Sequence, residues 1–102
     1  MSIFHLEPGQ VALVTYAGPG RRVELSLWID AEYATDAYVL NDEGIIQYRN
    51  EVLHLDTIAT GMNARQHQIR FVAPRNTAEI GVVLRNRSKA HPNSVSCWLR
   101  SM

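Results

Sequence analysis

Apolar and polar residues alternate with a period of two along much of the chain, which predicts strands rather than helices. The clearest run is RVELSLWID, residues 22–30. Its apolar residues share one side, and its polar residues share the other side with a tryptophan: Val23, Leu25, Leu27 and Ile29 against Glu24, Ser26, Trp28 and Asp30. We expect a half-buried strand here, with Trp28 on its outward side.

Similar runs recur between turn signals along the chain. The expected strands cover residues 11–17, 22–30, 37–40, 45–49, 52–60, 66–74, 78–86 and 95–100. Residues 41–44, NDEG, have the composition of a hairpin loop, and residues 30–37 predict a loop or one helical turn. About eight short strands at this spacing are typical of an all-β antiparallel β-sandwich. We expect a jelly-roll-like arrangement in a single domain spanning residues 1–102.

Charge narrows the function classes. The 102 residues carry ten basic and ten acidic side chains, so the formal net charge is zero. Nucleic-acid-binding proteins normally carry a basic excess, because neutralising phosphates supplies much of their affinity. No nucleic-acid partner is therefore expected. A zero net charge also gives little electrostatic protection against self-association, which favours a homo-oligomer or a protein partner.

Cysteine content and the N-terminal residues bear on location. Cys97 is the single cysteine, so the chain holds no intramolecular disulfide, and this favours a reducing compartment. Residues 1–10, MSIFHLEPGQ, lack the basic region and apolar core of a signal peptide. The sequence contains no apolar run long enough for a membrane helix. We expect a soluble, cytoplasmic protein with no membrane partner.

A late turn carries a family resemblance. Phe71 to Pro74 forms an F-x-x-P turn that leads into a strand from Ile80 to Asn86. With the hydrophobic spacing of VALVTY, VELSLWI and VSCWLRS, it resembles small bacterial β-sandwich modules, namely the pre-peptidase C-terminal domains and related GOLD-like sandwiches. The resemblance implies a non-catalytic accessory or binding module, with no catalytic residues to carry over.

Two tryptophans give the strongest functional clue. Trp28 and Trp98 both fall on outward sides, and an exposed indole is unfavourable unless a partner covers it. Three interpretations are open: a protein or self-interface, in which tryptophan is a preferred hot spot; a platform on which sugar rings stack; or a register slip that returns the indoles to the core. The candidate binding residues are Trp28, Trp98, Glu24, Asp30 and Arg100.

An acidic group and a histidine–aspartate pair could indicate metal-ion binding. Asp30, Glu32 and Asp36 could supply calcium ligands at a strand end, but their spacing does not match an EF-hand, and solvated loop acids are the simpler interpretation. His54 and Asp56 share a strand face. A transition-metal site needs three or four such ligands, so a structural pair is the simpler interpretation and no metal is expected.

Three further motifs have simple structural interpretations. Cys97 falls on the inward side of its strand, which predicts an inert core thiol. Residues 17–22, AGPGRR, lack the lysine and hydroxyl residue of a phosphate-binding loop and are interpreted as a turn. The basic loop with Arg85, Arg87, Lys89 and His91 could meet an acidic partner, but loops of this composition are usually solvated.

These observations favour a non-enzymatic interaction module without a cofactor, which self-associates or docks a protein partner through an outward aromatic face. The alternative is a carbohydrate-binding module on the same face, assisted by calcium. A small enzyme that uses His54 and Asp56 is the least favoured hypothesis. Dependence of the mass on concentration would support the first hypothesis, and quenching of the indole fluorescence by sugars would support the second.

Overall fold

The computed structural model describes residues 2–52 and 55–101 and shows an all-β chain with one short helix. Its elements are β1 (Ser2–Leu6), β2 (Val11–Ala17), β3 (Val23–Leu40), α1 (Asp42–Arg49), β4 (Ala59–Ala73), β5 (Glu79–Asn86) and β6 (Asn93–Ser101). All strand pairs are antiparallel. The expectation of an all-β antiparallel fold is therefore confirmed.

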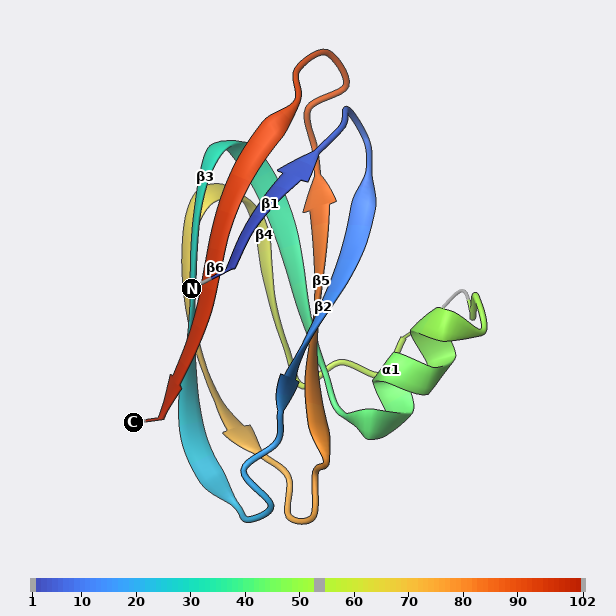
Figure 1. Cartoon of the computed structure of the whole chain (residues 1–102), viewed down its shortest axis with the longest axis vertical. Helices are drawn as coiled ribbons and strands as arrows, with labels where there is room; N and C mark the ends of the chain where they lie inside the picture. The colour runs from blue at the N-terminus through green and yellow to red at the C-terminus, as the bar shows by residue number, and fades with distance from the viewer. Residues whose placement is uncertain (1, 53–54, 102) are drawn as a thin grey trace.

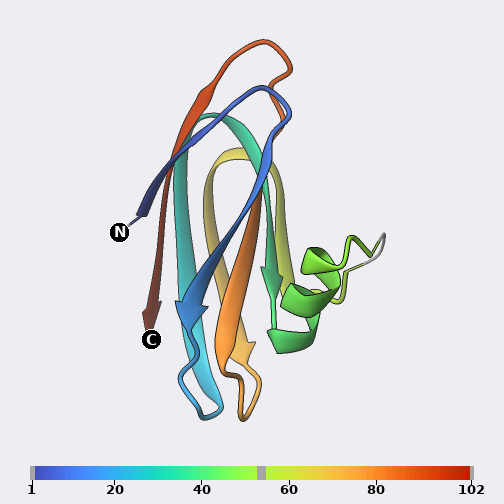
Figure 2. The same cartoon turned by 45° about the vertical axis from the view of Figure 1, so that its right-hand side comes forward.

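Two unusually long strands organise the sheet. The first part of β3, residues 25–31, pairs with β6, whereas residues 35–40 pair with β5, and β4 follows β3 along both parts. The hydrogen-bonded order is β1-β6-β3-β5-β2, with β4 beside β3. Because β3 and β4 bend, the sheet folds over on itself into a nearly closed shape, with β6 on one side and β5 and β2 on the other (Figures 1 and 2).

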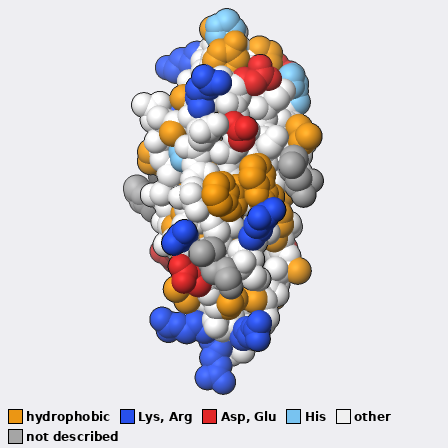
Figure 3. All heavy atoms as spheres, turned by 90° about the vertical axis from the view of Figure 1, so that its left-hand side faces the viewer, with side chains coloured by type: hydrophobic (Ala, Val, Ile, Leu, Met, Phe, Trp, Pro, Cys, Tyr) orange, Lys and Arg blue, Asp and Glu red, His pale blue; other side chains and the backbone are white. Residues whose placement is uncertain are grey.

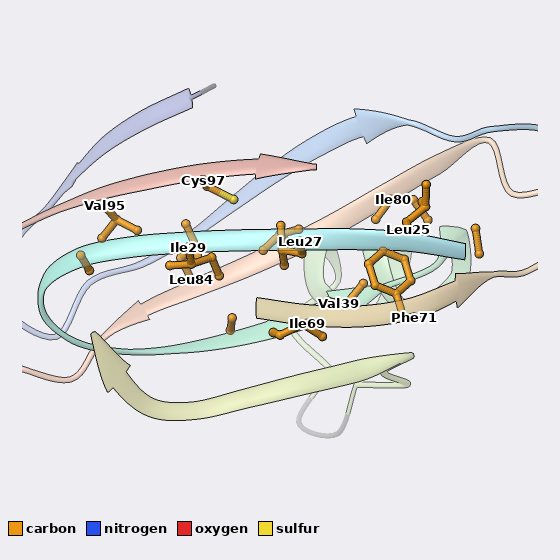
Figure 4. Packing of buried hydrophobic residues seen from close by; sticks show 14 of the residues in the cluster. Leu25, Leu27, Ile29, Val39, Ile69, Phe71, Ile80, Leu84, Val95 and Cys97 are labelled. Carbon is orange, nitrogen blue, oxygen red and sulfur yellow. The ribbon is translucent and has the colours of Figure 1, made fainter. Parts of the chain in front are cut away.

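The apolar side of the alternation fills the space inside this sheet. Leu27, Val39 and Leu84 are fully buried, and Phe71 from β4 packs into the same cluster (Figure 4). Each fully buried aliphatic side chain contributes about 1.5–3 kcal/mol relative to an exposed one. Of the inward positions predicted for residues 22–30, Leu25, Leu27 and Ile29 are buried and Val23 is partly buried, whereas Ser26, predicted to face outward, is also buried.

A network of buried amides holds the bend of β3. The register between β3 and β4 shifts between Asp30 and Thr35, which marks the bend. Asn93 accepts hydrogen bonds from the backbone N–H groups of Glu32 and Tyr33 at 3.1 Å, and donates to the Tyr33 carbonyl at 3.0 Å and to Asn86 Oδ1 at 3.3 Å. These bonds satisfy backbone groups that the interrupted ladder would otherwise leave unpaired.

The expected hairpin at residues 41–44, with a strand at 45–49, is wrong. Residues 42–49 form α1, and the Asn41 side chain caps it by accepting a hydrogen bond from the Gly44 N–H at 2.9 Å. Asp42 and Glu43 in the first turn and Arg49 in the last suit the helix dipole. Asp42 also accepts from the N–H groups of Ala78 and Glu79, which fixes the start of α1 to the start of β5.

Two other boundaries differ from expectation. Residues 30–37 belong to β3 rather than to a loop or a helical turn. The strand expected at residues 52–60 is replaced by an irregular segment that leads into β4 at Ala59, and residues 53–54 lie outside the described part of the chain. The run was misjudged because apolar residues in an irregular segment can alternate by chance over a few positions.

Candidate functional site

Trp28 and Trp98 lie side by side on the outer surface of the sheet. They are directly paired across β3 and β6, their ring centroids are 6.2 Å apart and their ring planes differ by 2°. Both indoles are partly exposed, while their chain neighbours Leu27, Ile29 and Cys97 are buried. The interpretation that placed the indoles in the core through a register slip therefore does not hold. Stacked aromatic pairs of this kind contribute about 0.5–1.5 kcal/mol of stabilisation in addition to the burial of their apolar surface.

The strand register arranges the residues around the indoles in three rows. We call these nine residues the tryptophan face. The central row is Gln68, Trp28 and Trp98; the basic row is Arg70, Ser26 and Arg100; the acidic row is Gln66, Asp30 and Ser96. The same side of the molecule shows a hydrophobic patch near its middle, with Lys or Arg side chains below it to either side and an acidic side chain above it (Figure 3).

Ser26 is an unusual member of this face. Its residue is 2% exposed although its strand position is outward, so neighbouring side chains cover it. Among the buried side-chain oxygen and nitrogen atoms of the described residues, only Ser26 Oγ has no hydrogen-bond partner. A buried hydroxyl without a partner is destabilising by about 1–3 kcal/mol.

The charges of the face have few partners among the described residues. Arg70 and Arg100 flank Ser26, and neither lies within ion-pair distance of a carboxylate in residues 2–52 and 55–101. Asp30 accepts one long side-chain hydrogen bond, from Gln66 Nε2 at 3.4 Å. The face therefore presents positive charge on one side of the indoles and negative charge on the other.

A shallow groove runs beside the indoles. Its volume is about 490 Å³, and Trp28, Trp98, Asp30, Gln66 and Gln68 contribute to its lining. It thus combines indole surface with one carboxylate and two amides. This volume falls in the range of small-molecule sites, although the groove is open rather than enclosed.

A larger hollow of about 880 Å³ lies between α1 and the outer side of β5. Tyr38, Tyr48, Arg49 and Arg85 contribute to its wall. The wall also includes Val52 and Leu55, which flank the two residues outside the described part of the chain.

The five predicted binding residues share one side of the sheet. Trp28, Trp98, Asp30 and Arg100 are in adjacent rows, and Glu24 lies at the far end, opposite Val72 and beyond the basic row. Sequence reasoning missed the contribution of β4. Its alternation places Gln66, Gln68 and Arg70 outward, but only the pairing of β4 with β3 brings them beside the indoles.

The three acidic residues considered as calcium ligands, Asp30, Glu32 and Asp36, are not brought together. Asp36 is fully buried and pairs with Arg87 at 3.0 Å, and it also accepts from the Asn63 N–H at 2.8 Å. Asp30, at the start of the bend, and Glu32, within it, are exposed. Across residues 2–52 and 55–101, no three His, Cys, Asp or Glu side chains form a group that could hold a metal ion.

The other expected polar groups have structural contacts. His54 lies outside the described residues, so its expected pairing with Asp56 is not tested, and Asp56 exchanges hydrogen bonds with Gln47. In the basic loop, Arg87 belongs to the ion pair with Asp36, and the His91 ring stacks on Tyr33 with centroids 4.9 Å apart. These contacts account for the positions of the Asp56, Arg87 and His91 side chains, so no ligand is needed to explain them.

Cys97 is a core thiol, as its inward position predicts. It is fully buried, and the Tyr16 hydroxyl donates a hydrogen bond to its Sγ at 3.3 Å. Burial raises the pKa of the Cys97 thiol above its ordinary value, and burial likewise raises the pKa of Tyr16. Both groups are therefore held in their protonated, uncharged forms.

These raised pKa values predict a loss of stability in alkali. Below the ordinary thiol pKa of 9.0 both folded and unfolded chains keep the proton, so the contribution to stability is complete. Above it the unfolded chain releases the proton first, and the free energy of unfolding falls as the pH rises towards the folded pKa. Urea denaturation at pH 7, 9 and 10.5 measures this decline, and Cys97→Ala should make it shallower. A native thiol that reacts with Ellman's reagent as fast as in urea would contradict the burial argument.

Comparison with known proteins identifies no relative: no protein-family model and no curated protein matches the chain. Within the described part of the chain, no helix is both long and apolar enough to cross a membrane.

Proposed function

We propose that the protein is a non-enzymatic interaction module, which buries the Trp28–Trp98 pair against another protein surface, foremost a second copy of itself. The observation that carries this proposal is the stacked indole pair at the centre of an outward sheet face. Protein interfaces have this anatomy, with aromatic residues at the centre and charged residues at the rim. The zero net charge of the chain adds no general repulsion between copies.

We also propose that the fold is a jelly-roll β-sandwich. If β3 and β4 are each divided at their bends, eight segments result. One layer would contain β1, β6, the first part of β3 and the second part of β4; the other would contain β2, β5, the second part of β3 and the first part of β4. This is the strand order of a jelly roll. A relationship to pre-peptidase C-terminal or GOLD-like modules stays a prediction.

Intrinsic fluorescence tests the proposed function directly, because the two tryptophans are both in the face. We expect blue-shifted emission with weak acrylamide quenching at high protein concentration, and red-shifted, readily quenched emission on dilution. The reason is that dissociation exposes indoles that the partner had covered. Light scattering of the same samples gives the mass. Emission and mass that do not change with concentration, together with ready quenching, would contradict self-association.

Sugar binding is the second candidate, supported by the groove beside the indoles. A sugar presents an apolar C–H face that stacks on an indole, and hydroxyl groups that bond to side chains such as Asp30 and Gln68. Titration with a panel of neutral and acidic oligosaccharides at low protein concentration tests it. Saturable quenching that Trp28→Ala abolishes would favour this candidate over self-association. An unchanged spectrum with every sugar would exclude the panel's sugar classes.

A further inference from the structure

The three rows of the tryptophan face are complementary to themselves. The acidic row and the basic row lie two residues from the central row on opposite sides, which is about 7 Å along the strands in each direction. A two-fold axis that crosses the strands along the central row exchanges these two rows. In contrast, an axis parallel to the strands would place the basic row against itself.

We propose that two copies of the chain pack face to face about the first of these axes, so that Asp30 of each copy lies over Ser26 and between Arg70 and Arg100 of the other. This inference rests on the proposed function and specifies its partner and geometry. It matches a carboxylate that has one long hydrogen bond with two guanidiniums that lie within ion-pair distance of no carboxylate among the described residues.

The proposed two-fold axis determines which residues of the two copies face each other. The axis keeps each strand opposite its own copy, so Trp28 faces Trp28 and Trp98 faces Trp98 of the second molecule. Along β3 it brings Asp30 opposite Ser26. The strands of two sheets that pack face to face usually cross at about −30°. At about 7 Å from the axis, this rotation displaces Asp30 sideways from Ser26 of the other copy by about 3 Å. The displacement moves it towards one of the two arginines, whose long side chains can follow it.

The size of the face suits a modest dimer interface. The layer contains β6 and parts of β3 and β4, each about 30 Å long, and β1, which is about 17 Å long. At a spacing of about 4.8 Å these strands give a plan area of about 500 Å², and side-chain relief raises the accessible area towards the about 800 Å² per partner of stable complexes. Val72 and Ile3 lie on the same side, at its two edges, and are 43% and 71% exposed. Closure would cover apolar surface that is now in water.

Reciprocal charge reversal tests the geometry. One variant carries Asp30→Arg and the other carries Arg70→Asp with Arg100→Asp. A homodimer of either variant would place like charges together in both halves of the interface. We therefore expect the dimer dissociation constant, measured by sedimentation velocity, to rise at least about tenfold for each variant. Mixed in equal amounts, the two variants carry opposite charges at every contact and should form a heterodimer. Glu7→Arg, in an exposed loop, is the matched control and should associate like the wild type.

The outcomes separate this geometry from the proposed function. Circular dichroism first establishes that each variant is folded. A heterodimer from two monomeric variants supports the geometry. If both variants are monomeric and their mixture is too, the face still associates but the symmetry is wrong. If both associate like the wild type, another surface such as an edge strand is responsible, and the geometry is overturned. A wild-type chain that is monomeric at every concentration overturns the proposed function as well.

Discussion

Replacement of Asn93 by alanine should lower the free energy of unfolding by about 3–4 kcal/mol, because four hydrogen bonds are lost at a fully buried position. The backbone N–H groups of Glu32 and Tyr33 would then have lost their acceptor at the bend of β3. A buried donor without a partner costs more than an average hydrogen bond contributes. The loss is a large part of the stability of an ordinary small domain.

Urea denaturation followed by far-ultraviolet circular dichroism measures this effect. Asn50→Ala is the matched control, because Asn50 is exposed and its side chain makes no hydrogen bond within the described residues. The control should change stability by less than about 0.5 kcal/mol. An Asn93→Ala protein with wild-type stability would show that the amide network does not hold the bend, and that the ladder on either side is sufficient.

Replacement of Trp28 by alanine should weaken self-association by about 30-fold to 1000-fold. A central tryptophan typically contributes at least about 2 kcal/mol to an interface. The lower value of the range corresponds to the loss of one such contribution. In the proposed two-fold dimer both copies lose the indole, so the upper value corresponds to the loss of two contributions, one from each copy. The groove beside the face also loses one indole wall.

Sedimentation velocity over a dilution series measures the change, and Trp98 remains as a fluorescent reporter. Ile46→Ala is the control, because Ile46 is 58% exposed on α1, which lies on the opposite side of the molecule (Figure 1). Trp28→Phe should associate with intermediate strength, since it keeps an aromatic ring. A Trp28→Ala protein that is folded and associates like the wild type would remove the tryptophan face from the interface.

The outward position of the two indoles could be predicted because the apolar alternation around them is clean. Leu25, Leu27 and Ile29 occupy the inward side of β3, so Trp28 has only the outward side left. The same reasoning places Trp98 opposite the buried Cys97. Strand side chains alternate strictly, so a few apolar residues fix the side of every neighbour.

The sequence carries signals for the helix α1 as well as for the hairpin expected at residues 41–44. Asn41 before two acidic residues is an N-cap signal, and Arg49 suits the last turn. The glycine at position 44 indicates a turn, although in the helix it leaves room that a Cβ would not, because a Cβ there would collide with the Asp56 carbonyl and press on Leu40. A glycine within a short polar run is compatible with both structures, and here tertiary packing selects between them.

The strand character of the chain, the sides of its clearest strands and the core position of Cys97 follow from the sequence, because these properties depend on residues that are neighbours along the chain. The three-dimensional arrangement puts β6 and β4 on either side of β3, which places Trp98, Arg100, Gln68 and Arg70 around Trp28 and Ser26. It also buries Asp36 against Arg87 rather than leaving it free for calcium. Strand pairing joins residues about 40 to 75 positions apart here, and local alternation carries no information about which strands will meet.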